Sequence, residues 1–189
     1  MSNITRPLPE HCDIYWSKRK YPNKHLTDQL SQDILKAKSN DALAAERIAS
    51  VMDHYVIEHE HLLNNVTQII PVPNYGSDNR CKAPLIAEIF AEKIRKRTGK
   101  NIHSYLDVLK RLNKTRQRRS GPAERRLSAE TDYQISDYIK NNNNLIKDNQ
   151  LLLVDDIITT GSTTEVCQDL LYDHGARTVK ILCAARTKF

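Results

Sequence analysis

Two adjacent carboxylates and a hydroxyl-rich loop are the residues of this sequence best suited to chemistry. The stretch from Leu151 to Thr163 reads LLLVDDIITTGST. Its apolar run predicts a buried strand that ends at Asp155 and Asp156, and the loop after it leads into a helix. Backbone N–H groups at a helix start, with hydroxyl donors beside them, suit a phosphate monoester. Gly161 lets the backbone approach such a ligand closely.

The two acids call for a different partner, because a carboxylate repels phosphate and accepts hydrogen bonds from hydroxyl groups. A ribose 5-phosphate offers both kinds of group. In open parallel sheets, ligands bind beyond the carboxyl ends of the strands, which is where this stretch is expected to lie. We therefore expect Asp155 and Asp156 to bind ribose hydroxyls. The residues expected to hold the 5-phosphate are Thr159, Thr160, Gly161, Ser162 and Thr163.

The positive charge of the chain is concentrated in one segment. The net charge is +6, yet residues 110–126 hold eight basic residues and one acid, Glu124, so this segment carries +7 and the remainder −1. Gly121 and Pro122 favour a loop there. We expect a polyanion to meet this loop. The alternative is a solvated basic surface without a ligand.

The elements that position these residues follow from apolar periodicity. Strand 151–154, helix 162–174 and strand 178–184 form a βαβ unit, whose strands are parallel. Residues 1 to about 25 are expected to be an irregular arm. The other expected elements are two helices over 26–63 broken near Ser39 and Asn40, a strand over 66–73, a helix from Pro84 to Gly99, a weak strand over 101–109 and an ambiguous element over 132–139.

Length and composition indicate one globular domain. The chain has 189 residues, of which 39% are hydrophobic and 28% charged. No run approaches the roughly 20 apolar residues of a membrane helix, and the N-terminus lacks the features of a secretory signal, so we expect a cytoplasmic protein.

The four cysteines form no CxxC pair. The histidines and acids between His54 and His61 lack HExxH spacing and predict a solvated helix face rather than a metal site.

The stretch from Leu151 to Thr163 resembles the motif of type I phosphoribosyltransferases that binds 5-phosphoribosyl-1-pyrophosphate (PRPP). The sequence IPVP at 70–73, followed by a polar loop, resembles the family's first strand and its pyrophosphate loop. The basic segment sits where the family's flexible hood loop lies. Within the family, the closest likeness is to ComF-type proteins, which likewise carry a glutamine and a downstream Glu-Arg pair in this region, here Gln117 and Glu124-Arg125.

The chain departs from the ComF pattern at two places. It lacks the cysteine-rich zinc module that often begins ComF proteins, and the loop at 74–82 lacks their arginine-rich pattern. The regions that resemble the family cover residues 66 to 187. The N-terminal 65 residues resemble it only vaguely. An assignment of Arg80 to pyrophosphate therefore has only its position in the loop to support it.

The resemblance implies an α/β fold with a parallel sheet flanked by helices and a flexible basic hood loop. Residues 66–189 would form the phosphoribosyltransferase-like core, and residues 1–65 an arm and helices packed on it, within a single domain. The implied activity, in nucleotide metabolism, is transfer of the 5-phosphoribosyl group from PRPP to a nitrogenous base or similar acceptor, with release of pyrophosphate. Mg²⁺ would be bound mainly through PRPP, with no metal ligand from the chain. A homodimer is also implied.

The resemblance also assigns roles to single residues. Those implied to act in catalysis are Asp155, Asp156, Arg116 and Arg118. Besides the two acids and the loop 159–163, PRPP would contact Val72, Pro73 and Arg80. An alternative function is a ComF-like accessory or regulatory protein that binds PRPP, a nucleotide or single-stranded nucleic acid without transferring ribose. The basic loop would then follow a phosphate backbone, with Tyr105 or Tyr133 available for stacking.

Overall fold

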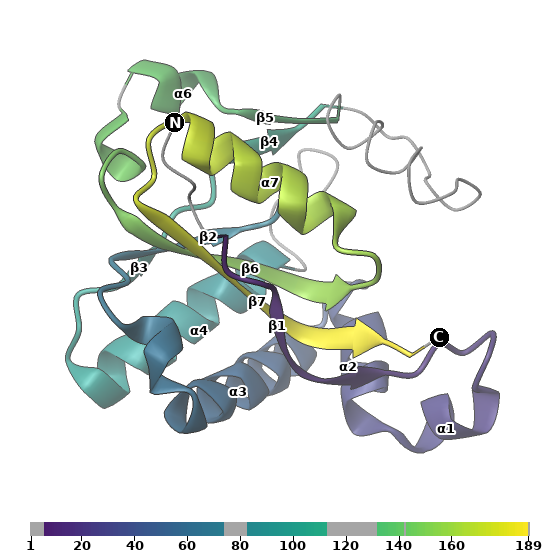
Figure 1. Ribbon diagram of the computed structural model, residues 1–189. Helices are drawn as coiled ribbons and strands as arrows, with labels where there is room; N and C mark the ends of the chain where they lie inside the picture. Colours follow the sequence, from purple (N-terminus) through teal and green to yellow (C-terminus); the bar gives the residue numbers. More distant parts are fainter. Residues whose placement is uncertain (1–5, 74–82, 113–131, 142, 189) are drawn as a thin grey trace.

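A five-stranded parallel sheet organises the molecule in the computed structural model, which describes residues 6–73, 83–112, 132–141 and 143–188 (Figure 1). The strand order is β1-β7-β6-β2-β3, and every neighbouring pair is parallel. The strands are β1 (Glu10–Tyr15), β2 (Gln68–Pro71), β3 (His103–Ser104), β6 (Gln150–Ile158) and β7 (Thr178–Thr187). A separate antiparallel pair joins β4 (Leu109–Arg111) to β5 (Tyr133–Ile135). The predicted α/β class is confirmed.

Helices cover both faces of the sheet, with α3 and α4 on one face and α7 on the other (Figure 1). The helices are α1 (Pro22–Thr27), α2 (Gln29–Ala37), α3 (Ala42–Glu58), α4 (Ala83–Thr98), α6 (Asp137–Asn141) and α7 (Ser162–Asp173), with 3₁₀ turns η1 (Glu60–Leu63) and η3 (Asn143–Leu145). The predicted break between two N-terminal helices is confirmed at Asn40, whose φ is +73°. Within the described part of the chain, no helix is long and apolar enough to cross a membrane.

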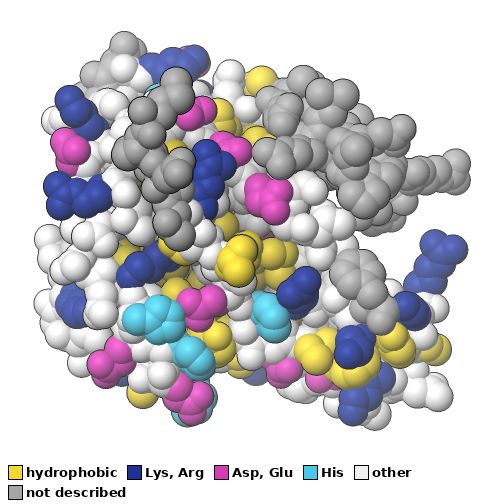
Figure 2. Space-filling view, viewed as in Figure 1, with side chains coloured by type: hydrophobic (Ala, Val, Ile, Leu, Met, Phe, Trp, Pro, Cys, Tyr) yellow, Lys and Arg dark blue, Asp and Glu magenta, His cyan; other side chains and the backbone are white. Residues whose placement is uncertain are grey.

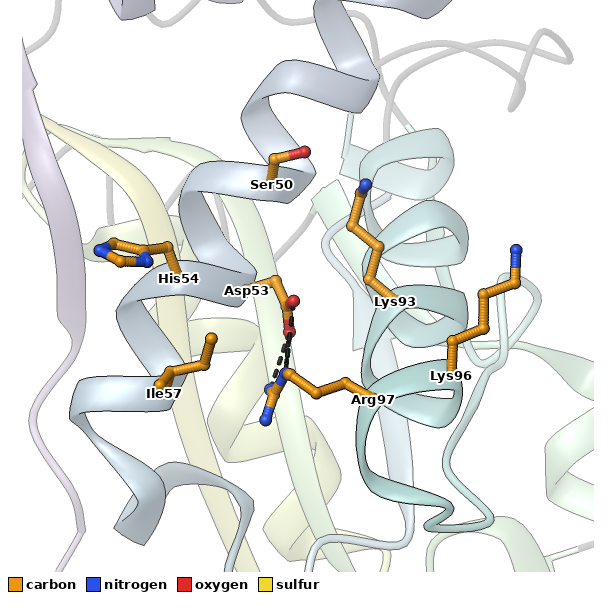
Figure 3. Close-up of a pocket in the computed structure, with 7 residues that line it drawn as sticks. All are labelled: Ser50, Asp53, His54, Ile57, Lys93, Lys96 and Arg97. Carbon is orange, nitrogen blue, oxygen red and sulfur yellow. Dashed lines mark hydrogen bonds and ion pairs between the residues drawn. The ribbon is translucent and has the colours of Figure 1, made fainter.

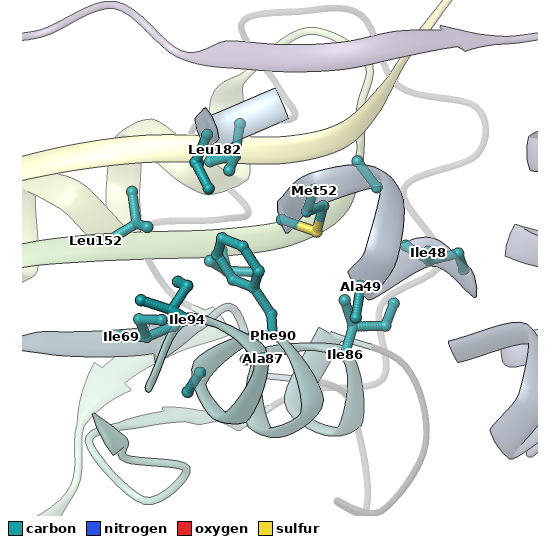
Figure 4. Close-up of a cluster of buried hydrophobic side chains, with 14 of the residues drawn as sticks. Ile48, Ala49, Met52, Ile69, Ile86, Ala87, Phe90, Ile94, Leu152 and Leu182 are labelled. Atoms are coloured by element: carbon teal, nitrogen blue, oxygen red, sulfur yellow. The ribbon is translucent and has the colours of Figure 1, made fainter. Parts of the chain in front are cut away.

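Two apolar layers hold the sheet between its helices. Leu152 and Val154 of β6 join the cluster beneath α3 and α4, where Phe90 is fully buried (Figure 4). Leu151 and Leu153 join the cluster on the α7 side. This alternation is the period of a strand, and a strand buried on both faces has an uninterrupted apolar sequence. The stretch of β6 that is fully buried on both faces therefore ends directly before the two acids.

The N-terminal residues differ from the irregular arm that the sequence predicts. Residues 10–15 form β1, which pairs in parallel with β7 from Glu10 opposite Leu182 to Tyr15 opposite Thr187. The prediction failed because β1 is an edge strand with polar residues such as Asp13, and its partner lies at the far end of the chain, beyond any local pattern. The N-terminal residues thus belong to the same sheet as the two acids.

The strand that carries the acids is also longer than predicted. Strand β6 continues through Ile158, and Asp155, Ile157 and Ile158 are paired with β7. The extra length is explained by β7, which extends to Thr187 and offers a parallel partner to the β-branched residues after the acids. The carboxylates therefore project from a paired strand rather than from a loop.

Candidate functional site

Each of the two acids on β6 is held by the backbone of the next residue. Oδ1 of Asp155 accepts a hydrogen bond from the N–H of Asp156 at 2.8 Å, and Oδ1 of Asp156 accepts one from the N–H of Ile157 at 2.8 Å. These bonds restrict both side chains. A carboxylate has about four acceptor positions, so each acid keeps free acceptor capacity for a ligand hydroxyl.

The surroundings of Asp155 oppose its ionisation. Burial, together with the charge of Asp156, raises the pKa of Asp155 well above its usual range, and the positive charge of Lys38 offsets this only in part. Burial and the charge of Asp155 in turn raise the pKa of the Cys167 thiol on α7. Two adjacent carboxylates thus occupy a site that accepts negative charge poorly, a common property of functional sites.

A lysine from the N-terminal helices meets the second acid. Nζ of Lys38, at the end of α2, lies 3.2 Å from Oδ2 of Asp156. Burial alone would lower the pKa of Lys38, yet the charge of Asp156 and the hydrogen bond to it raise this pKa. Sequence reasoning missed Lys38, because nothing local to residue 38 indicates that α2 ends beside β6.

The loop from Thr159 to Thr163 leads into α7 without a side-chain cap. Gly161 is the N-cap residue, has a left-handed φ of +87°, and makes no capping hydrogen bond with a side chain. The N–H of Glu165 donates to the Gly161 carbonyl at 2.9 Å and closes the first turn. The hydroxyls of Thr160 and Ser162 lie 3.0 Å apart. First-turn amides have no partner within a helix, and with the helix dipole they favour an anion.

The antiparallel pair β4 and β5 brings together Arg111 of the basic segment and Tyr133, which the sequence offered only as a residue for stacking. The Arg111 guanidinium lies 5.4 Å from the centre of the Tyr133 ring and 4.0 Å from the Asp132 carboxylate. Its Nε is buried without a hydrogen-bond partner. Burial raises the pKa of the Tyr133 hydroxyl, and the side chain of Thr163 offsets this only in part. A cation and a protonated phenol thus lie behind the loop that precedes α7.

The remaining predicted site residues are only partly described. The N–H of Val72 donates to the carbonyl of Val154 at 2.8 Å, and proline has no N–H, so neither Val72 nor Pro73 has a free amide for a ligand. They extend β2 along β6 and fix where the next segment starts. Arg80, Arg116 and Arg118 lie outside the described residues, and their assignment remains a prediction.

Histidines near the end of α3 pair with acids in separate contacts. Figure 2 shows histidine and acidic side chains close together on the face in view. Nε2 of His54 lies 3.7 Å from Glu58, and Nε2 of His61 lies 2.8 Å from Glu10, while His59 stacks on Tyr55. Across the described ranges, no three histidine, cysteine, aspartate or glutamate residues are placed to hold one metal ion.

A shallow groove lies between α3 and α4, and neither Asp155 nor Asp156 lines it (Figure 3). Arg97 crosses it and binds Asp53, with NH2 at 2.8 Å and Nε at 3.2 Å from Oδ1. Lys93 lies 3.8 Å from Glu46, and Lys96 lies 2.6 Å from Glu92. The Lys and Arg side chains of this groove already have acidic partners. The carboxyl end of β6 is therefore the better candidate site.

The sequence and the structure were compared with known proteins. Residues 87–188, more than half of the chain, match the family model of the phosphoribosyl transferase domain. No curated protein matches the chain. Two solved structures are similar: an allosteric regulatory enzyme of purine biosynthesis (TM-score 0.40, 17% identity, 62% of this chain and 21% of that chain) and Schistosoma mansoni hypoxanthine-guanine phosphoribosyltransferase in complex with IMP (TM-score 0.39, 14% identity, 77% and 66%). This chain thus spans less than two thirds of either structure.

Proposed function

The chain belongs to the phosphoribosyl transferase domain family, and from this membership we propose that it transfers the 5-phosphoribosyl group of PRPP to a nitrogen acceptor and releases pyrophosphate. The observation that supports the proposal most is one juxtaposition. Asp155 and Asp156, which accept hydrogen bonds, stand a few residues before the uncapped start of α7, which donates them. A ribose 5-phosphate needs acceptors for its hydroxyls and donors for its phosphate.

In this proposal the chain contacts PRPP at both ends of the ligand, its 5-phosphate and its diphosphate. The 5-phosphate lies at the start of α7, held by amides of the loop 159–163 and by the hydroxyls of Thr159, Thr160, Ser162 and Thr163. Asp155 and Asp156 accept hydrogen bonds from the ribose 2- and 3-hydroxyls. The diphosphate meets the cations of the basic segment, among them Arg116 and Arg118, and Arg80 of the loop after Pro73. Arginine suits this role, since it contacts phosphate oxygens in pairs.

The donor set of the chain fits a magnesium ion carried mainly by PRPP. Hard cations prefer oxygen ligands, and Asp155 and Asp156 are the acids at this edge of the sheet. In this proposal the diphosphate and ribose oxygens provide most of the coordination. When bound, Mg²⁺ supplies positive charge that neutralises the leaving diphosphate.

The proposed transfer breaks the bond between ribose C1 and the diphosphate oxygen and forms a bond between C1 and the acceptor nitrogen. The electron pair of the broken bond leaves with pyrophosphate, and the acceptor loses a proton. Positive charge develops on the ribose ring in between, and the carboxylates of Asp155 and Asp156 favour it electrostatically. Holding the ribose at its hydroxyls and phosphate orients C1 for attack. A closed basic segment would exclude water.

A second candidate function is binding without transfer, as an accessory or regulatory protein of the ComF type. The concentration of charge favours it, because residues 110–126 carry +7 in a chain with a net charge of +6. Such a segment can follow the phosphates of a single-stranded nucleic acid, and the affinity would then fall steeply with salt. The closer likeness to ComF-type proteins is itself part of this proposal.

Calorimetry with PRPP and MgCl₂ tests the first function. The wild type is expected to bind, the double variant Asp155→Asn, Asp156→Asn is expected to lose binding, and pyrophosphate release should depend on one nucleobase of a panel. Asp13→Asn is the matched control, because Asp13 on β1 accepts the same bond from its next residue, the N–H of Ile14, at 2.7 Å. Binding without release for any base would favour the second function. The absence of PRPP binding would overturn both the transfer and the PRPP site.

A further inference from the structure

An ion pair joins the N-terminal helices to the candidate site. Lys38 and Asp156 lie 3.2 Å apart, and their side chains are 38% and 16% exposed. Salt screens such a partly buried pair less than a surface pair. We propose that Lys38 is a positioning residue that holds Asp156 in place to bind a ribose hydroxyl of PRPP. This inference rests on the proposed function and extends it to residues that precede the part of the chain matching the family model.

The backbone around Lys38 is ordered by its own hydrogen bonds. The N–H of Lys38 donates to the Ile34 carbonyl at 3.2 Å. In the turn that follows, the N–H groups of Ser39 and Asp41 both donate to the Lys36 carbonyl, at 2.8 and 3.2 Å. The ammonium group is therefore presented from the end of a helix and a tight connection. A partner fixed in this way loses little conformational freedom when a ligand binds.

The two oxygens of Asp156 have different partners. Oδ1 accepts the N–H of Ile157 at 2.8 Å, and Oδ2 faces Lys38. Together these contacts fix the plane of the carboxylate. Each oxygen can accept more than one hydrogen bond, so the contact with Lys38 leaves capacity for a hydroxyl. A carboxylate that is already oriented needs no reorganisation when the ribose arrives.

Lys38 also balances the charge of the acid pair. Its positive charge lowers the pKa of Asp155 against the stronger effects of burial and of the Asp156 charge. The other titratable groups that interact with Lys38 or with the acid pair are Tyr15 of β1, Tyr133 of β5, Cys167 of α7 and Cys183 of β7, and none of them supplies a positive charge. Without Lys38, Asp155 would take up a proton at a higher pH, because the charge of Lys38 lowers the pKa of this residue. A protonated carboxyl has less acceptor capacity, so ribose binding would be lost at that higher pH as well.

Calorimetric titration of PRPP with MgCl₂ between pH 5 and pH 9 tests the role of Lys38. Lys38→Met is expected to weaken binding about tenfold at pH 8, the effect of losing one hydrogen bond to a charged group. The loss of affinity on acidification should begin at a higher pH than in the wild type. Lys38→Arg should restore most of the affinity. Lys36→Met, which removes an exposed lysine from the same helix, is the matched control and should bind as the wild type does.

A second pair of variants separates positioning from a general effect on the fold. In an Asp156→Asn background, Lys38→Met should cause no further loss of PRPP affinity, and thermal unfolding of each variant shows whether it is folded. The same tenfold loss in both backgrounds, or wild-type affinity of the single variant, would overturn the role of Lys38. Failure of the wild type to bind PRPP is a different result, since it overturns the proposed function and this inference falls with it.

Discussion

Helices on the two faces of the sheet begin in opposite ways. Helices α2 and α3 begin at Asp28 and Asp41, whose carboxylates accept the N–H groups of Ser31 at 2.8 Å and Ala44 at 3.0 Å. Helix α7 begins at Gly161, which makes no side-chain cap. The first two helix starts are satisfied within the chain, whereas the third leaves its amides to another partner.

This difference in capping distinguishes helix starts that stabilise the fold from a helix start that can bind an anion. A capping side chain is worth about 1 kcal/mol to a folded protein, and an anion at the same place would meet its negative charge. A helix start that receives a phosphate therefore cannot also carry an aspartate cap. Helices α2 and α3 thus carry aspartate caps, whereas α7, the helix that follows the two acids, has no side-chain cap.

The largest expected effect comes from giving α7 the cap that α3 has. Gly161→Asp places a carboxylate where we expect the 5-phosphate, and like charges in contact should weaken PRPP binding about a hundredfold or more. Calorimetric titration with PRPP and MgCl₂ measures the affinity. The control is Gly99→Asp, because Gly99, just past the end of α4, also has a left-handed φ, +69°, and a Cβ added there would meet no atom within 4 Å. If both variants bind PRPP equally well, the start of α7 is not the phosphate site.

A smaller effect is expected from removing a cap on the other face. Asp28→Ala should lower the free energy of unfolding by about 1 kcal/mol, because the N–H of Ser31 loses its partner. PRPP affinity should stay within twofold of the wild type. Chemical denaturation and calorimetry measure the two quantities. A large loss of PRPP affinity with unchanged stability would contradict the view that the cap on α2 serves stability and the start of α7 serves PRPP binding.

The smallest expected effect has the opposite sign. Because the pKa of Asp155 is raised, the folded chain holds this proton more tightly than the unfolded chain, and ionisation costs stability as the pH rises from the unfolded pKa through the folded one. Asp155→Asn should therefore stabilise the fold by about 0.5 kcal/mol at pH 8, a typical cost of a functional residue. The gain should vanish below about pH 4, where Asp155 is protonated in both states. Urea denaturation at several pH values measures the difference, and destabilisation at pH 8 would show that the ionised acid supports the fold.

Local patterns predicted the βαβ unit well because each part of it has a local cause. The run from Leu151 to Val154 is uninterrupted since it is buried on both faces, and Gly175, with a φ of +90°, follows α7 where the predicted helix ends. Asp155 and Asp156 directly follow this run, although the pattern did not show that β6 continues past them to Ile158. Strand β1 was missed because an edge strand with polar residues has no such signature.

The sequence by itself determined which residues belong to one short stretch: the apolar strand, the two acids and the loop that opens α7. Neighbours along the chain are joined by local geometry, so spacing is enough to place them. Only the tertiary structure decided that Lys38, among the basic residues that the structure describes, meets Asp156. Lys38 reaches Asp156 because α2 packs on α3 and β1, and Arg111 lies against Tyr133 because β4 pairs with β5. Such contacts depend on packing between distant segments, and no local pattern records that packing.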